Sequence, residues 1–174
     1  MAHDLNLFFF INGAAGRFHI ADLLIIFLGE YFPYIFIGLF LLLVLRAKKK
    51  GPLFWIPVIS AVIARLGIVP LIRFFYHRPR PFMIYHVHQL ITDNTWSFPS
   101  GHATFFFALA AGTFFFNKSW GIGFFVAAFL VSLGRVAGGV HYPSDILAGM
   151  IIGTVTAWIV HWFFEKKPRS IPFG

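Results

Sequence analysis

Apolar residues run through most of the chain in long stretches separated by short polar segments. Each stretch is close to the roughly 20 residues that an α-helix needs to cross a hydrocarbon core of about 30 Å. The third stretch is the shortest. The pattern predicts five transmembrane helices, over residues 20–45, 52–76, 101–116, 120–140 and 146–164.

Two features qualify this five-span prediction. Pro33, Pro57 and Pro70 can kink or split a helix, so a sixth, short span is an alternative that the pattern leaves open. Residues 4–12 hold an apolar run too short to cross a membrane, and we expect it to form an interfacial helix. The predicted fold is an all-α, polytopic transmembrane bundle that forms a single domain over residues 1–174.

The composition indicates that a membrane is the solvent. Hydrophobic residues make up 59% of the chain and aromatic residues 20%, and the mean hydropathy of +0.79 is too high for a soluble domain. The formal net charge of +8 suits anionic headgroups, so we expect the bilayer and a lipid as partners and no nucleic acid. The chain has no cysteine, which excludes disulfides and thiolate metal sites. The pattern carries no signal for an oligomeric state.

Basic residues divide unevenly between the two sides of the bundle when the five spans are threaded alternately through the membrane. The positive-inside rule assigns to the cytoplasm the side that receives Arg46, Lys48–Lys50, Lys118, Lys166, Lys167 and Arg169. The opposite side receives the N-terminus, the segment 73–97 and the turn 141–144. Because Arg73, Arg78 and Arg80 also fall there, the rule requires these three to be functional residues.

Three polar clusters interrupt the apolar pattern, and the threading places all of them at the outer membrane face. The first, residues 73–81, is a basic exit from the second span. Guanidinium groups are planar forks that match phosphate oxygens, so Arg73 and Arg80 are candidate phosphate ligands. A belt of interfacial charge is the alternative for this segment.

The second cluster, residues 97–102, opens the third span with the sequence Ser-Phe-Pro-Ser-Gly-His. Pro99 suits the first turn of a helix, and the free backbone N–H groups of a helix start bind anions. His102 can donate or accept a proton at that position. A simple helix cap is the alternative for this segment.

The third cluster, residues 134–145, covers the end of the fourth span and the start of the fifth. Asp145 follows His141 by four residues, close enough to accept from Nδ1–H and to hold the tautomer whose other nitrogen attacks. Arg135 precedes His141 by six residues. A histidine with both neighbours at a membrane edge indicates chemistry rather than structure.

Together the three clusters resemble the signature of the type 2 phosphatidic acid phosphatases, a membrane family related to vanadium haloperoxidases and glucose-6-phosphatase. The family pattern is a basic residue, six residues and Arg-Pro, then Pro-Ser-Gly-His, then Ser-Arg, five residues, His, three residues and Asp. The matching residues here are Arg73 with Arg80-Pro81, Pro99-Ser100-Gly101-His102, and Gly134-Arg135 with His141 and Asp145. The sequence departs at two positions, because Arg73 replaces Lys and Gly134 replaces Ser.

The resemblance implies phosphoryl transfer without a metal or other cofactor. His141 would attack phosphorus to form a phosphohistidine, with Asp145 orienting it, while His102 would protonate the leaving oxygen and then activate water. The non-bridging oxygens would be held by Arg73, Arg80, Ser100, Gly101 and Arg135. His86 and His88 have no third ligand in their segment, which disfavours a zinc site.

Within this family the sequence looks like the bacterial undecaprenyl-diphosphate phosphatases, through segments 78–82, 86–90 and 98–102. That resemblance implies conversion of undecaprenyl diphosphate to undecaprenyl phosphate and phosphate, at the extracytoplasmic face of a bacterial plasma membrane. Phosphatidic acid, phosphatidylglycerophosphate, lipid A phosphate and phosphotransfer between lipids are alternatives. A non-catalytic anion or lipid transporter is a remote alternative, since a transporter that binds anions through its arginines does not need His102, His141 and Asp145.

Two charges lie inside predicted spans, Glu30 in the first and Arg65 in the second. At 1.5 Å per residue their depths match, with Arg65 about 12 Å below Arg73. Because the two spans are antiparallel neighbours, the sequence predicts an ion pair between Glu30 and Arg65 beneath the phosphate site. The alternatives are a neutral Glu30, or an Arg65 that bonds to backbone carbonyls or lines a water pocket.

Overall fold

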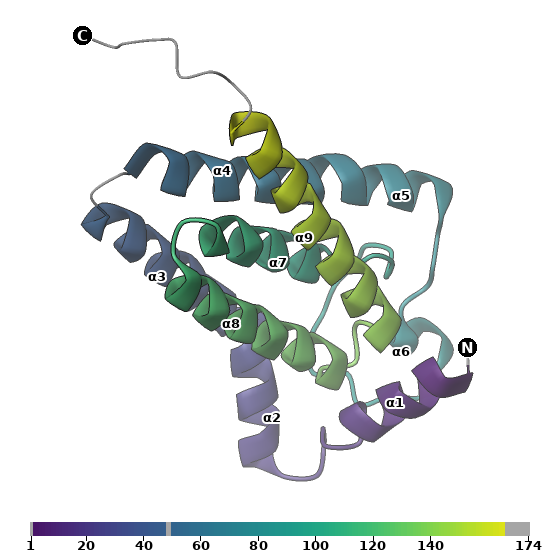
Figure 1. Ribbon diagram of the computed structural model, residues 1–174. Coiled ribbons are helices and arrows are strands. Elements are labelled where there is room, and N and C mark those ends of the chain that lie inside the picture. Colours follow the sequence, from purple (N-terminus) through teal and green to yellow (C-terminus); the bar gives the residue numbers. More distant parts are fainter. Residues whose placement is uncertain (1, 48–49, 166–174) are drawn as a thin grey trace, which may run out of the picture.

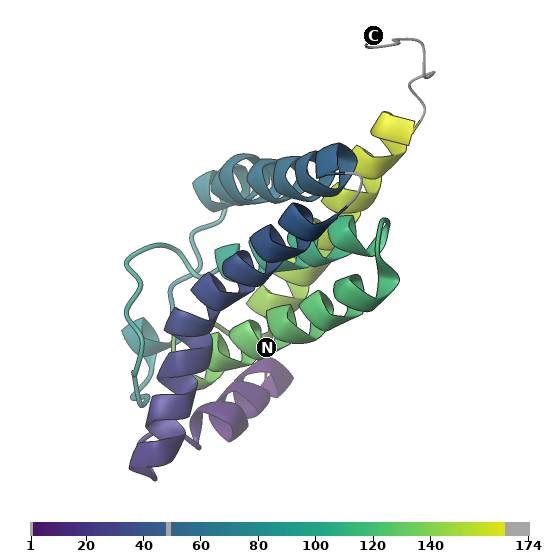
Figure 2. The ribbon, with the colours of Figure 1, turned by 90° about the vertical axis from the view of Figure 1, so that its left-hand side faces the viewer.

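The computed structural model describes residues 2–47 and 50–165, and every regular element in these two ranges is helical. Figures 1 and 2 show long helices side by side, with α1 and α6 at the end of the bundle where α5 ends and α9 begins. In chain order the helices are α1 (Ala2–Asn12), α2 (His19–Ile26), η1 (Phe27–Tyr31), α3 (Phe32–Arg46), α4 (Lys50–Val62), η2 (Ile63–Ile68), α5 (Val69–Phe75), α6 (Pro81–Ile84), α7 (Gly101–Phe114), α8 (Lys118–Ala137) and α9 (Pro143–Glu165).

The predicted all-α membrane bundle is confirmed. Four continuous helices in the described residues are long and apolar enough to cross a membrane, namely His19–Arg46, Gly51–Phe75, Lys118–Ala137 and Pro143–Glu165. The fifth predicted span is α7, which has 14 residues and measures about 21 Å. It is buried along almost its whole length between α4, α8 and α9, so it serves as the central helix of the bundle.

Prolines bend the first two spans without dividing them, which favours five spans over six. The first span runs from α2 through the π-helical turn η1 into α3, and the second from α4 through η2 into α5. Pro33 and Pro70 lie just after these two π-helical turns. Because proline has no N–H to donate, the preceding turn adjusts its hydrogen bonding, and a π-helical segment is one way to do so.

Glycines allow the helices to pack closely around the start of α7. A Cβ atom added at Gly149 would lie 2.8 Å from Ser100 O, and one at Gly153 would collide with Thr104 O. Small residues of this kind let helix backbones approach in membranes. The contact fixes the start of α9 beside the start of α7, where Ser100 N donates to Asp145 O over 3.1 Å.

The predicted N-terminal helix is α1, which lies across the end of the bundle (Figure 2). Its buried Phe8 packs with Val136 and Tyr142, while Phe10 is 82% exposed. The side chain of Asn12 donates to two backbone carbonyls, His88 O and Ala137 O. These bonds anchor α1 to the loop before α7 and to the end of α8, so α1 closes one end of the bundle.

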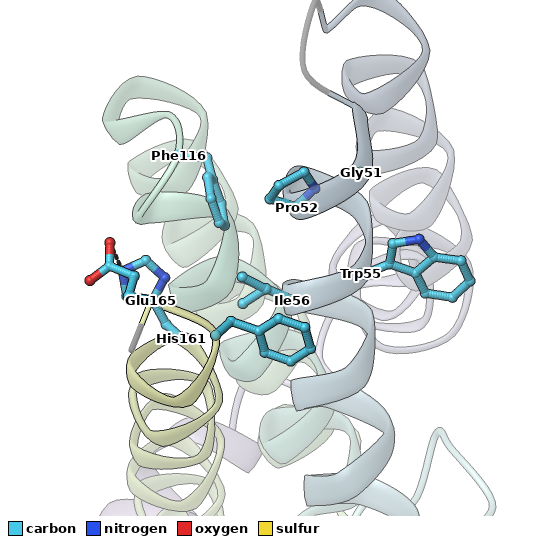
Figure 3. Close-up of a pocket in the computed structure, with 8 residues that line it drawn as sticks. Gly51, Pro52, Trp55, Ile56, Phe116, His161 and Glu165 are labelled. Atoms are coloured by element: carbon cyan, nitrogen blue, oxygen red, sulfur yellow. Dashed lines mark ion pairs between the residues drawn. The ribbon is translucent and has the colours of Figure 1, made fainter. Parts of the chain in front are cut away.

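The opposite end of the bundle holds a mainly apolar cavity of about 690 Å³, shown in Figure 3. It lies where α4 begins and α9 ends, between residues Gly51, Pro52, Trp55, Ile56, Phe116, His161, Phe164 and Glu165. The His161 ring stacks on Phe115 with centroids 4.1 Å apart and forms a 3.3 Å ion pair with Glu165. Helix α3 ends and α8 begins at this end too, with the basic residues Arg46 and Lys118.

Candidate active site

The three polar clusters come together at the end of the bundle covered by α1. Arg80 Nη1, from the first cluster, lies 3.3 Å from His141 Nε2 in the third. The second cluster is bound to both of the others, because Ser97 Oγ donates to Asp145 Oδ2 and Arg73 Nη2 donates to Pro99 O. Residues far apart in the sequence thus form one polar centre.

Asp145 is a carboxylate of this centre with partners on both of its oxygens. Its side chain is fully buried in the first turn of α9. Oδ2 accepts from Ser97 Oγ at 2.5 Å and Tyr142 N at 2.9 Å, and it faces His141 Nδ1 at 3.4 Å. Oδ1 accepts from Arg78 Nη1 at 2.7 Å. Because both oxygens are held, the carboxylate is fixed in place and can orient the His141 ring.

His141 is buried between this carboxylate and an arginine. Its Nδ1 faces Asp145, and a proton on Nδ1 leaves the lone pair on Nε2, which points at Arg80. Burial lowers the pKa of His141 to about 4; the hydrogen bond and charge of Asp145 raise it, and the charges of Arg80 and Arg135 lower it further. The imidazole is therefore neutral at pH 7, which is the form that can act as a nucleophile.

Arg80 is fully buried at the start of α6 and is held on three sides. It donates through Nε to Thr95 O at 2.6 Å and through Nη1 to Val140 O at 2.7 Å, and it pairs with Asp93 at 2.8 Å. Burial lowers the pKa of Arg80 to about 10, so the group keeps its charge at neutral pH. The bonds aim a cationic fork at the His141 ring.

Arg135 is buried in the last turn of α8 and pairs with two carboxylates. Its Nη2 donates to Asp93 Oδ2 at 2.8 Å, and its Nη1 donates to Glu30 Oε1 at 3.2 Å. Asp93 thus bridges Arg80 and Arg135 through its two oxygens. Burial would raise the pKa of Asp93, but the charge of Arg80 and hydrogen bonds from Thr95 lower it. Arg80 and Arg135 therefore both bind the carboxylate of Asp93.

The predicted ion pair between Glu30 and Arg65 is wrong, because Glu30 pairs with Arg135 instead. The cause is the close contact of η1 with α8 rather than with η2. A Cβ atom added at Gly134 would lie 2.6 Å from Gly29 N, so the two backbones almost touch. The same contact explains why glycine replaces serine at position 134, since a larger residue would push Glu30 away from Arg135.

Within residues 2–47 and 50–165, two buried arginine nitrogens of this centre have no hydrogen-bond partner, Arg73 Nε and Arg135 Nε. The remaining nitrogens of Arg73 donate to Thr95 Oγ1 and Pro99 O, each over 2.9 Å. Buried donors are almost always bonded, so two open donors in a cationic centre indicate the place of an anionic ligand.

The start of α7 supplies the remaining predicted residues. Ser100 is the N-cap, and its Oγ accepts from Ala103 N. Gly101 begins the helix, whose first N–H groups favour anions. Among the described residues His102 has no hydrogen bond or ion pair, but it interacts electrostatically with His141 and Arg135. A histidine without a fixed partner beside the site is suited to exchange protons.

Comparison with known proteins identifies the family. Residues 54–169 match the PAP2 superfamily. The chain belongs to the PAP2 superfamily. Together with the apolar helices, this membership makes it an integral membrane phosphatase.

The matches to related proteins cover nearly the whole of this PAP2 chain. The bacitracin transport permease protein BcrC of Bacillus licheniformis is 32% identical over 94% of this chain and 81% of its own length. The undecaprenyl-diphosphatase BcrC of Bacillus subtilis is 28% identical over 98% and 87%. The crystal structure of Aquifex aeolicus LpxE has a TM-score of 0.75 and 28% identity, and the match covers 93% of this chain and 96% of that one.

The sequence pattern indicated no specific catalytic or binding role for several residues that build this PAP2 site. Arg78 donates to Asp145 and Asp4, and its guanidinium carbon lies 3.9 Å from the Tyr142 ring centre. Burial would lower the pKa of Arg78, but Asp145 and Asp4 raise it. Ser97 and Arg78 lie inside the polar clusters, so their positions were a usable signal. Asp93 and Asp4 lie outside the polar clusters, so no sequence signal pointed to them.

The paired histidines of the loop before α7 line a cavity that has no arginine in its lining. His88 packs against the turn at Gly16, where an added Cβ atom would lie 2.5 Å from its Nδ1. His86 and His88 line a separate cavity of about 340 Å³ with Phe82, Tyr85, Val87 and Gln89. No group of three His, Cys, Asp or Glu residues suited to a metal ion occurs within residues 2–47 and 50–165.

Proposed function

We propose that the protein removes the terminal phosphate of undecaprenyl diphosphate through a phosphohistidine at His141. The observation that carries this proposal is the buried His141–Asp145 pair beside arginines with two open donors. A nucleophile with an orienting carboxylate and an anion-binding cradle are the parts that metal-free phosphoryl transfer needs. The substrate follows from the relative named undecaprenyl-diphosphatase, which matches 98% of this chain.

The reaction proceeds in two displacements. In the first, His141 Nε2 attacks the terminal phosphorus, the bond to the bridging oxygen breaks, and His102 gives that oxygen its proton. In the second, His102 takes a proton from water, whose oxygen attacks phosphorus and releases His141. The products are undecaprenyl phosphate and inorganic phosphate, and both histidines return to their starting forms.

The arginines stabilise charge on the transferring group. Arg73 and Arg135 offer their open Nε donors to non-bridging oxygens, and Arg80 adds a third cation beside the nucleophile. The N–H groups at Gly101 complete the cradle. Ser100 acts by capping α7 and by binding the backbone of Asp145, which keeps the two halves of the site in register.

The site lies on the extracytoplasmic face in this proposal. Lys118 and Arg46 mark the opposite end of the bundle, as the positive-inside rule requires of a cytoplasmic side. Because the chain has no cysteine, single cysteines at Gln89 and Lys118 report the two sides cleanly. In intact cells an impermeant thiol reagent should label Gln89→Cys and spare Lys118→Cys. The reverse pattern would invert the proposed orientation.

The direct test of the substrate is phosphate release by the purified full chain in detergent. We expect polyprenyl diphosphate to be hydrolysed faster than phosphatidic acid, phosphatidylglycerophosphate or lipid A at equal surface concentration. A preference for one of these three would replace the proposed substrate within the same chemistry. Release from none of the lipids would reject the enzyme and favour transport, the function named for the Bacillus licheniformis relative.

A further inference from the structure

Arg65 lies in the second span but reaches the start of α7. It belongs to η2, one turn of helix before α5. A Cβ atom added at Gly101 would lie 2.6 Å from Arg65 Nε and 2.7 Å from its Cζ. The guanidinium group therefore rests on the backbone of Gly101, next to His102, and a side chain at position 101 would force Arg65 to move.

The π-helical turn points Arg65 and Arg73 in the same direction. In an uninterrupted α-helix, eight residues turn the chain by about 80° beyond two full turns, so the two side chains would diverge. The π-helical turn η2 accommodates one residue more than an α-helical turn does. The side chains of Arg65 and Arg73 then point within about 20° of each other around the helix axis. Both arginines accordingly face the same cavity.

That cavity has a volume of about 710 Å³ and lies between the second span and the segment before α7. Apart from the two arginines, its walls are mainly apolar and include Val69, Phe74 and Trp96. A cavity with cations at one side and apolar walls suits an amphiphile with an anionic head. It is distinct from the apolar cavity at the opposite end of the bundle, which has no arginine in its lining.

The charge of Arg65 is not balanced within the described residues. The side chain of Arg65 has no hydrogen bond or ion pair there, although it interacts electrostatically with both Arg73 and His102. Of the arginines at positions 65, 73, 80 and 135, only Arg80 and Arg135 form ion pairs within the described residues, with Asp93 and Glu30 as partners. A charge inside a membrane span is costly unless a partner compensates it, so a further anion belongs beside Arg65.

The chemistry of a diphosphate supplies that anion. When a phosphate monoester is cleaved, the leaving group is an alcohol that becomes neutral once protonated. When a diphosphate is cleaved, the leaving group is itself a phosphate monoester and carries negative charge. Because His102 serves the leaving oxygen in the proposed reaction, that second phosphate lies on the His102 side of the site, where Arg65 is.

We propose that Arg65 binds the lipid-side phosphate of a diphosphate substrate and thereby gives the site its preference for diphosphates. This assignment rests on the proposed phosphatase reaction. The terminal phosphoryl group is held by Arg73, Arg80 and Arg135, and the departing phosphate is held by Arg65 as charge develops on it. The lipid chain then extends along the apolar wall of the cavity.

The test compares two substrates with the same polyprenyl chain, one a diphosphate and one a monophosphate. Arg65→Gln should lower kcat/KM for the diphosphate about 100-fold and for the monophosphate less than about 3-fold. Arg65→Lys should restore about 10-fold of the loss, because it returns the charge without the fork. The matched control is Arg46→Gln, at the opposite end of the bundle, which should behave like wild type with both substrates.

A second readout does not depend on the lipid. Methylenediphosphonate should inhibit Arg65→Gln at least about 10-fold more weakly than wild type, while inhibition by inorganic phosphate stays unchanged. Equal loss on both substrates, or unchanged inhibition by the diphosphonate, would overturn the role of Arg65. If wild type hydrolyses only monophosphates, the proposed substrate fails, and the diphosphonate result with the lipid that it does hydrolyse still decides whether Arg65 binds a second phosphate.

Discussion

The bundle carries a histidine with a carboxylate four residues later at each of its two ends. At the end covered by α1, His141 faces Asp145 at 3.4 Å, with 1% and 0% of their side chains exposed. At the other end His161 faces Glu165 at 3.3 Å, with 15% and 69% exposed (Figure 3). The spacing and the distance are nearly the same, so neither of them distinguishes a catalytic pair from a surface pair.

What differs is the surroundings. Asp145 is held by Ser97, Tyr142 and Arg78, and the far side of the His141 ring faces Arg80. The His161 ring instead stacks on Phe115 beside an apolar cavity. A buried carboxylate with all its bonds made can orient a ring, and arginines can hold a phosphate, whereas an exposed pair contributes little. These surroundings are the reason why the proposed chemistry is placed at His141 and not at His161.

The largest expected effect is the loss of the nucleophile. His141→Asn should lower kcat at least about 10,000-fold, because the proposed reaction has no other nucleophile. His161→Asn is the matched control and should stay within about 2-fold of wild type. Steady-state phosphate release from purified variants measures both. Comparable losses in the two variants would mean that the difference between the two ends has been misassigned.

The next effect concerns the carboxylates. Asp145→Asn should lower kcat by about 100- to 10,000-fold, because the amide no longer holds the Nδ1–H tautomer or stabilises the charged ring. Glu165→Gln should leave kcat unchanged. Circular dichroism in detergent checks that both variants keep the helical fold. An active Asp145→Asn enzyme would show that the carboxylate is dispensable.

The smallest effect is on stability against pH. Burial lowers the pKa of His141 to about 4 from 6.5, so between these values only the unfolded chain takes up the proton. Stability from the neutral ring is present above pH 6.5 and is lost as the pH falls to 4. The difference in Tm between wild type and His141→Asn should shrink from pH 7 to pH 4.5. The corresponding loss in the free energy of unfolding of wild type is at most about 3 kcal/mol. His161→Asn should follow wild type, and a constant Tm difference between wild type and His141→Asn would contradict the lowered pKa.

Sequence patterns were sufficient for the spans, and they mark the positions for which chemistry is proposed. Hydropathy marks each long helix because lipid demands apolar side chains over a fixed length. The polar clusters are visible because charge is costly in an apolar background, which is why His141, Asp145 and the arginines at 73, 80 and 135 stand out. The structure brings all of these residues to one end of the bundle.

Partnerships between distant residues were beyond reach of the sequence. Glu30 was paired with Arg65 because the two residues lie at the same predicted depth. Which residues touch also depends on which helices are neighbours and on how each helix is rotated about its axis. Here the π-helical turns and the close glycine contacts set both. Asp93 lies in a loop with no periodicity, so nothing indicated that it would bridge Arg80 and Arg135. The alternative in which Arg65 lines a pocket is the one that the structure supports.

The most direct test of the account is to trap the covalent intermediate. His102→Gln should slow its hydrolysis, and p-nitrophenyl [³²P]phosphate, whose leaving group needs no proton, should still form it. After rapid quenching in base, the account predicts stoichiometric label that is stable to base, labile to acid, and located on His141 by mass spectrometry of the peptide. Label on any other residue, or p-nitrophenol release without label, would contradict a phosphohistidine at His141.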